Sequence, residues 1–183
     1  MIDNNSLSFS QAIQATQSLM EKINIQELDE VKIENEVSSI VSTKNGGRGF
    51  FVAYLTSDFS LPDKPSVGII QGLKSSSEIV SRLLVKNLAM SSAMTITHSR
   101  NNDITNVRGS QKVYRRTSNM IQQINLDSVK RELKKLETAI ATGNGDYNYF
   151  LERWGYDVEQ KAAIQRAIAD TLYFGTENND PQL

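Results

Sequence analysis

The sequence contains no cysteine, and this absence excludes several kinds of chemistry. A chain without cysteine has no disulfide, no thiol nucleophile, no iron–sulfur cluster and no zinc site built on thiolates. Histidine occurs once, as His98, and the sequence has neither an H-E-x-x-H pair nor a D-x-D-x-D-G loop. We therefore predict no metal site and no cofactor.

Long apolar runs are also absent. No uninterrupted run approaches the roughly 20 residues that a membrane-spanning helix needs. The first residues, MIDNNSLSFSQ, lack the basic region and the apolar core of a secretory signal. We expect a cytoplasmic protein that does not bind membranes.

Proline is scarce, with three residues, whereas apolar residues recur at three- and four-residue steps through most of the chain. A chain of 183 residues with 39% hydrophobic content has enough apolar area for one core and too little for two independent ones. We predict a mainly α fold, a compact single-domain helical bundle over residues 1–175. A flexible polar tail, residues 176–183, is expected to follow it.

The segment 75–99 carries apolar residues on nearly every side of a helical projection, and a helix of that kind is buried. Ser75 followed by Glu78 has the spacing of a capping box, which predicts where this helix begins. We expect it to be the central helix of the bundle. The same spacing at Asp157 and Gln160 predicts the start of the last helix.

Residues 45–49 read NGGRG, which raises the question of a phosphate-binding loop. Nucleotide-binding glycines follow a strand, with the spacing G-x-G-x-x-G or G-x-x-x-x-G-K-S/T, and neither spacing is present. Lys44 followed by Asn45 and Gly46 is instead typical of the end of a helix. We interpret this stretch as a helix stop and a turn.

The apolar run in residues 50–57 has the composition of a strand, but one strand leaves its backbone donors and acceptors unpaired. Few other segments resemble a partner strand. We favour one or two buried helical turns here. The alternative is an α+β fold with a small hairpin formed by residues 50–57 and 66–71.

Ser110, directly after Gly109, is expected to cap a further helix. The helix after it has the most regular amphipathic pattern of the chain, because its apolar residues alternate at three- and four-residue steps. They are Leu126, Val129, Leu133, Leu136 and Ile140. We predict that this stripe is a seam between two copies of the chain in a homodimer.

Charge is unevenly distributed along the sequence. Residues 1–65 hold five basic and nine acidic residues, residues 66–135 hold twelve and four, and residues 136–183 hold three and eight. The basic residues that gather on two helices of the middle segment are Arg108, Lys112, Arg115, Arg116, Lys130, Arg131, Lys134 and Lys135. Like charges one turn apart destabilise a helix unless something offsets them.

Two kinds of partner could neutralise this basic surface. We favour acidic helices of the same chain or of a second subunit. The alternative is an anionic partner, such as nucleic acid, a phosphorylated ligand or an acidic protein surface. The sequence pI near 5.9 and the few aromatic residues on these helices disfavour nucleic acid.

Four polar residues of the central helix are weak candidates for a ligand site: Asn87, Ser91, His98 and Arg100. Asn87 and Ser91 lie one turn apart on an otherwise apolar helix, so they either bond to neighbouring backbone or line a small polar cavity. A single histidine near a helix end is more often structural than catalytic.

These patterns lead to three functional hypotheses. The first is a non-enzymatic helical protein that acts through protein–protein contacts in assembly or regulation, as a homo-oligomer. The second is a small-molecule-binding protein or enzyme with a pocket beside the central helix. The third is a regulator that binds nucleic acid through the basic middle segment.

Overall fold

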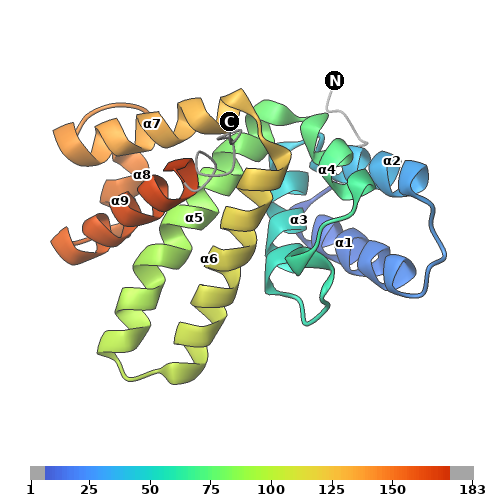
Figure 1. The fold of residues 1–183 in the computed structure, drawn as a ribbon, viewed down its shortest axis with the longest axis horizontal. Helices are drawn as coiled ribbons and strands as arrows, with labels where there is room; N and C mark the ends of the chain where they lie inside the picture. Colours follow the sequence, from blue (N-terminus) through green and yellow to red (C-terminus); the bar gives the residue numbers. More distant parts are fainter. Residues whose placement is uncertain (1–6, 174–183) are drawn as a thin grey trace, which may run out of the picture. The chain divides into compact units, whose positions relative to one another are not determined.

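The computed structural model describes residues 7–173, and these form nine α-helices, one short 3-10 helix and no strand (Figure 1). The prediction of a mainly α fold is confirmed. In chain order the elements are α1 (Phe9–Asn24), α2 (Glu30–Val41), α3 (Lys44–Thr56), η1 (Leu61–Asp63), α4 (Val67–Lys74), α5 (Ser77–Arg100), α6 (Ile104–Ile124), α7 (Asp127–Thr142), α8 (Asn148–Trp154) and α9 (Val158–Tyr173).

The chain divides into two compact units, Met1–Leu83 and Leu84–Leu183, and the boundary falls inside α5. This division does not test the prediction of a single domain over residues 1–175, which stays a prediction. The predicted tail, residues 176–183, lies outside the described residues.

In the first unit α1 packs on α3. The first turn of α1 meets the second turn of α3 where Gly49 faces Ala12, since a Cβ atom on Gly49 would lie 2.6 Å from the Cβ of Ala12. Farther along both helices, Met20 and Thr56 line a common hollow. The two helices therefore run parallel and end at the same place.

The second helix pair of this unit is α2 with α4. A Cβ atom on Gly72 of α4 would lie 2.6 Å from the Cβ of Val37 in α2. At the start of the same pair the Glu30 carboxylate accepts a hydrogen bond from the Gly68 N–H. Bare backbone at Gly49 and Gly72 thus allows both helix pairs to pack closely.

The glycine-rich stretch 45–49 belongs to α3, so the predicted helix stop at Asn45 and Gly46 is wrong. The preceding helix ends earlier, at Val41, and the Thr43 hydroxyl accepts from the Gly46 N–H at 3.1 Å to cap the new one. Tertiary packing keeps these glycines helical despite their low intrinsic propensity. The predicted helical turns at residues 50–57 are confirmed, and the alternative hairpin is wrong because residues 67–70 belong to α4.

The central helix is α5, and its predicted burial is confirmed for most of its length. Its buried residues are Val80, Ser81, Leu84, Val85, Leu88, Ala89, Ser91, Ser92 and Ala93. Residues 94–98 are half-buried, and the last two residues of the helix are exposed. The predicted capping box is wrong, because the Ser75 hydroxyl donates to the Gly72 carbonyl at 2.7 Å and closes α4 instead.

In the second unit α9 packs on α6 and α7, and α8 packs on α7. The helix expected to begin after Gly109 starts earlier, because Asp103 caps α6 through the Asn106 N–H at 3.1 Å. The predicted capping box at the start of α9 is confirmed. The Gln160 N–H donates to Asp157 at 2.9 Å, and the Asp157 N–H donates to the Gln160 side chain at 3.0 Å.

Candidate functional site

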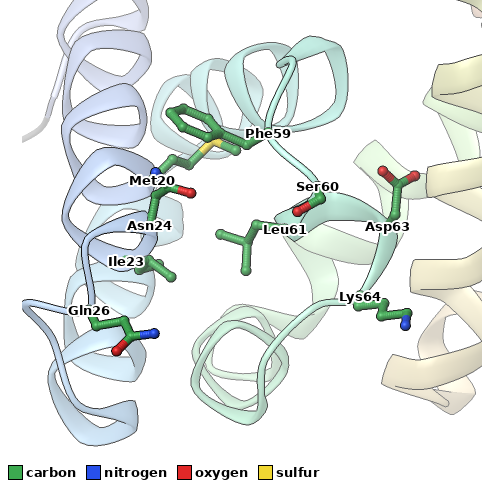
Figure 2. A pocket seen from close by; sticks show the side chains of 9 residues that line it. All are labelled: Met20, Ile23, Asn24, Gln26, Phe59, Ser60, Leu61, Asp63 and Lys64. Carbon is green, nitrogen blue, oxygen red and sulfur yellow. The ribbon is translucent and has the colours of Figure 1, made fainter.

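The end of α1, with Gln26 just beyond it, and the loop that follows α3 line a hollow of about 470 Å³. Its lining residues are Met20, Ile23, Asn24, Gln26, Phe59, Ser60, Leu61, Asp63 and Lys64. Figure 2 shows Leu61 pointing into the space between α1 and the loop, while Lys64 points away from α1. The hollow is therefore lined by both apolar and polar side chains.

A second hollow, of about 620 Å³, adjoins the first. It is lined by Ile13, Gln17, Met20, Glu21, Val52, Ala53, Thr56, Ser57, Asp58 and Phe59. Because Met20 and Phe59 line both hollows, the two lie side by side, and we call them together the Phe59 groove.

The loop wall of the Phe59 groove is held in place by hydrogen bonds. The hydroxyl of the buried Tyr54 donates to the Leu61 carbonyl at 3.4 Å, and the Lys64 N–H donates to the same carbonyl at 3.1 Å. Pro62 lies in the 3-10 turn and is buried. This wall is preformed, which lowers the entropic cost of binding.

Gln26 forms part of the opposite wall and has a left-handed backbone, with φ 58°. Its N–H donates to the Ile23 carbonyl at 3.0 Å, and the Glu27 N–H donates to the Lys22 carbonyl at 2.9 Å. This pair of bonds is the Schellman motif that ends many helices, usually with glycine or asparagine at the left-handed position. Glutamine there carries strain, and backbone strain concentrates at functional sites.

The groove is electrostatically negative at its second hollow. Glu21 and Asp58 are the charged residues that line this hollow, and both are acidic and exposed. The C-terminal end of α3 also lies here, and its last turn contains no basic residue. The negative end of a helix dipole adds to the field of the two carboxylates.

The four candidate residues of the central helix all lie on α5, and none of them lines the Phe59 groove. Ser91 donates to the Asn87 carbonyl at 2.7 Å, a bond within its own helix. His98 is half-buried. Arg100 pairs with Asp157 at 2.6 Å and with Glu159, which fastens the start of α9 to the end of α5. Their role in ligand binding stays a prediction.

The basic residues of the middle segment do not form one continuous exposed ridge. Arg116 is 3% exposed, so its predicted place on the surface is wrong; it shares its side of α6 with the buried Thr117 and Met120. The remaining seven are exposed or half-buried. On α7, Lys130 pairs with Asp127 at 3.5 Å, which neutralises part of the charge within the same helix.

Lys135 belongs to a buried polar network that the sequence pattern did not indicate. Glu132, 4% exposed, accepts from the Tyr147 hydroxyl at 2.7 Å and from the Lys135 ammonium at 2.9 Å. Lys135 also pairs with Asp146 at 3.1 Å. These bonds tie the loop before α8 to α7, and they raise the pKa of Lys135, Glu132 being the larger cause and Asp146 the next.

The predicted seam of α7 is largely covered by the chain itself. Val129, Leu133 and Leu136 are at most 1% exposed, whereas Leu126 and Ile140 are half-buried. A second copy would reach the three central residues only if they were uncovered. The seam as an interface between copies stays a prediction.

Sequence reasoning missed the Phe59 groove because no local motif marks it. Met20 and Phe59 are far apart in the chain and meet only through the parallel packing of α1 on α3. The two prolines at 62 and 65 were the one available signal, since they indicated an ordered loop.

Neither a metal site nor a membrane span is found in the part of the chain that the structure describes. Residues 7–173 contain no group of three or more acidic or histidine side chains that could hold a metal ion. None of their helices combines the length and apolar character needed to cross a bilayer.

Comparison with known proteins places the chain in a family. The sequence pattern of the family described as Uncharacterised conserved protein UCP020893 matches residues 8–171, so the chain belongs to this family. No curated protein and no solved structure shows a significant match.

Proposed function

We propose that this member of an uncharacterised family acts by non-covalent contact with another protein, without catalysing a reaction, and that the Phe59 groove is its binding surface. The main observation in support of this proposal is that Met20 and Phe59 line both hollows. Two adjoining depressions on either side of an aromatic side chain suit a peptide segment that inserts one side chain on each side of that ring.

Three features of the groove support this proposal. Its walls come from regular helices and a hydrogen-bonded loop, so the shape exists before a partner arrives. Its rim offers amide and hydroxyl groups, such as Asn24 and Ser60, for hydrogen bonds to a peptide backbone. Gln26 holds a left-handed backbone at the edge of the groove, and backbone strain of this kind is found at binding sites.

A selection from a random peptide display library tests this function. The selection is run on the wild-type chain, and each recovered peptide is then measured against two variants. Val52→Tyr fills the second hollow from an exposed position, where Val52 is 45% exposed. Val31→Tyr is the matched control, because Val31 is 67% exposed on α2 and does not line the groove.

We expect recovered peptides to bind wild type and Val31→Tyr equally and to bind Val52→Tyr about tenfold or more weakly, as for an obstructed anchor pocket. Circular dichroism of both variants verifies that the fold is kept. If no recovered peptide distinguishes Val52→Tyr from Val31→Tyr, the groove is not the binding surface and the proposal fails.

A further inference from the structure

We infer that the occupant of the Phe59 groove is a segment of a partner protein that places a Lys or Arg side chain in the second hollow and an apolar side chain beside Leu61. This inference rests on the proposed function. It assigns a chemistry to the partner, and that chemistry follows from how charge is distributed between the two hollows.

The second hollow attracts a cation from several directions. Glu21 and Asp58 line it from α1 and from the loop after α3, and no basic residue lines it. The last turn of α3, which contains no basic residue, reaches the same hollow through Thr56. Carboxylates and helix C-termini both favour positive charge, so a Lys or Arg side chain fits this end.

The first hollow has a different character. Its apolar lining is made of Ile23, Leu61, Met20 and Phe59, and its polar lining near α1 is made of the uncharged Asn24 and Gln26. Figure 2 shows Asp63 and Lys64 on the loop side, farther from α1 than Leu61. Apolar area removed from water drives binding at this end.

A peptide segment satisfies both ends at once. The aliphatic stem of Lys or Arg can cover Val52 and Ala53 while its charged head stays beside the exposed carboxylates. The next apolar side chain of the same segment then reaches across Phe59 into the first hollow. The predicted partner motif is a basic residue close to an apolar one, in a segment that is not strongly acidic.

The test uses one fluorescein-labelled peptide recovered in the selection described above. It also uses two forms of this peptide in which the basic residue, Lys or Arg, is replaced by Gln or by Glu. Fluorescence anisotropy gives Kd for the wild-type chain, for Glu21→Gln and for Glu27→Gln. Glu27 is the matched control, because it is an exposed glutamate just beyond α1 that does not line the groove.

We expect loss of the peptide's positive charge to weaken binding about two- to fivefold, the range for exposed ion pairs. The variant Glu21→Gln should bind the parent peptide more weakly by a similar factor and should bind the Lys→Gln peptide almost as tightly as wild type does. The control Glu27→Gln should bind both peptides with the wild-type affinity. The affinity of the parent peptide should also fall as sodium chloride is raised, because salt screens exposed charges.

Two results would overturn the inference while leaving the groove as a binding surface. One is that the peptides whose binding is weakened by Val52→Tyr lack basic residues, or that their Lys→Gln forms bind with the same affinity as the parent peptides. The other is a chain that dimerises in light scattering and loses this dimer in Val52→Tyr, which would make a second copy the occupant. If no recovered peptide binds Val52→Tyr more weakly than Val31→Tyr, the proposed function itself is contradicted.

Discussion

Gly49 of α3 faces Ala12 of α1 so closely that a Cβ atom on Gly49 would lie 2.6 Å from the Cβ of Ala12. This close approach sets the packing of α1 on α3, and residues farther along both helices line the Phe59 groove. The groove therefore depends on a glycine in the second turn of α3.

Gly49→Ala is predicted to destabilise the protein by about 1–3 kcal/mol, the usual cost of overpacking a core. The added methyl would also lie 2.7 Å from the Phe9 carbonyl oxygen, so backbone as well as side chain must move. Urea denaturation followed by circular dichroism gives the free energy of unfolding.

Gly109→Ala is the matched control for this prediction. Gly109 lies inside α6, and a Cβ atom there would meet no other atom within 4 Å. Alanine should stabilise the helix by about 0.5–1 kcal/mol, because it has the higher helix propensity. If Gly49→Ala and Gly109→Ala change the free energy of unfolding by the same amount, the close packing at Gly49 is contradicted.

Gln26→Gly is predicted to stabilise the protein and to weaken peptide binding. Relief of the left-handed strain, about 1–2 kcal/mol, is set against the roughly 0.5–1 kcal/mol entropic cost of glycine, so a net gain of up to about 1.5 kcal/mol in the free energy of unfolding is expected. Loss of the side-chain amide removes part of the wall of the first hollow. Thermal unfolding and peptide anisotropy measure the two effects.

Gln26→Asn separates these two effects, because asparagine tolerates the left-handed conformation better and keeps an amide. The Gln26→Asn variant should be slightly more stable than wild type, and it should bind peptide more tightly than Gln26→Gly does. A glycine variant that binds peptide as wild type does would show that Gln26 is not part of the binding surface.

The ion pair of Arg100 with Asp157 is predicted to contribute stability at neutral pH and none in acid. A hydrogen bond from Arg100 is the largest cause that holds the pKa of Asp157 below its usual value of 3.8. A carboxylate with a lowered folded-state pKa stabilises the protein above its unfolded pKa, and this contribution is lost as pH falls through the folded pKa.

Arg100→Met should therefore lower the urea midpoint near pH 7, and the difference in midpoint from wild type should shrink as the pH falls through the folded-state pKa of Asp157. Arg108→Met, at an exposed arginine of α6, is the control and should show a smaller difference at neutral pH. A difference for Arg100→Met that stays constant with pH would contradict the assigned role of the pair.

Tyr147→Phe is predicted to cost about 1.5–3 kcal/mol, the range for a buried hydrogen bond to a charged group. The tyrosine hydroxyl donates at 2.7 Å to Glu132, and both residues are less than 5% exposed. Urea denaturation measures the loss. Tyr149→Phe is the control, because Tyr149 is 73% exposed and its change should stay within about 0.5 kcal/mol.

Local patterns predicted those features of the fold that depend on local interactions. The alternation of apolar residues predicted a mainly helical chain, and the pair Asp157 and Gln160 predicted the start of α9 from a bond that spans three residues. The buried turns of the central helix were predicted because apolar residues surround it. Each of these features is encoded within a few neighbouring positions.

The same local reasoning was wrong at the glycines. Asn45 and Gly46 have the composition of a helix end, yet both lie in α3, because the gain from close packing outweighs the low helix propensity of glycine. Ser75 has the spacing of an N-cap for α5 but bonds back to Gly72 and ends α4. A capping pattern indicates which hydrogen bonds a side chain is able to form. Which of these bonds it forms depends on the helix that lies next to it.

The sequence by itself determined that this protein is helical, that it has no cysteine chemistry, and that its charge is concentrated in segments. Only the tertiary structure decided that Arg116 and Glu132 are buried, that the leucines of α7 are covered, and that Met20 and Phe59 share a groove. Helical periodicity and composition are read from neighbouring residues. Burial and concavity arise where distant helices meet, and that meeting is set by side-chain volumes that no short stretch of sequence specifies.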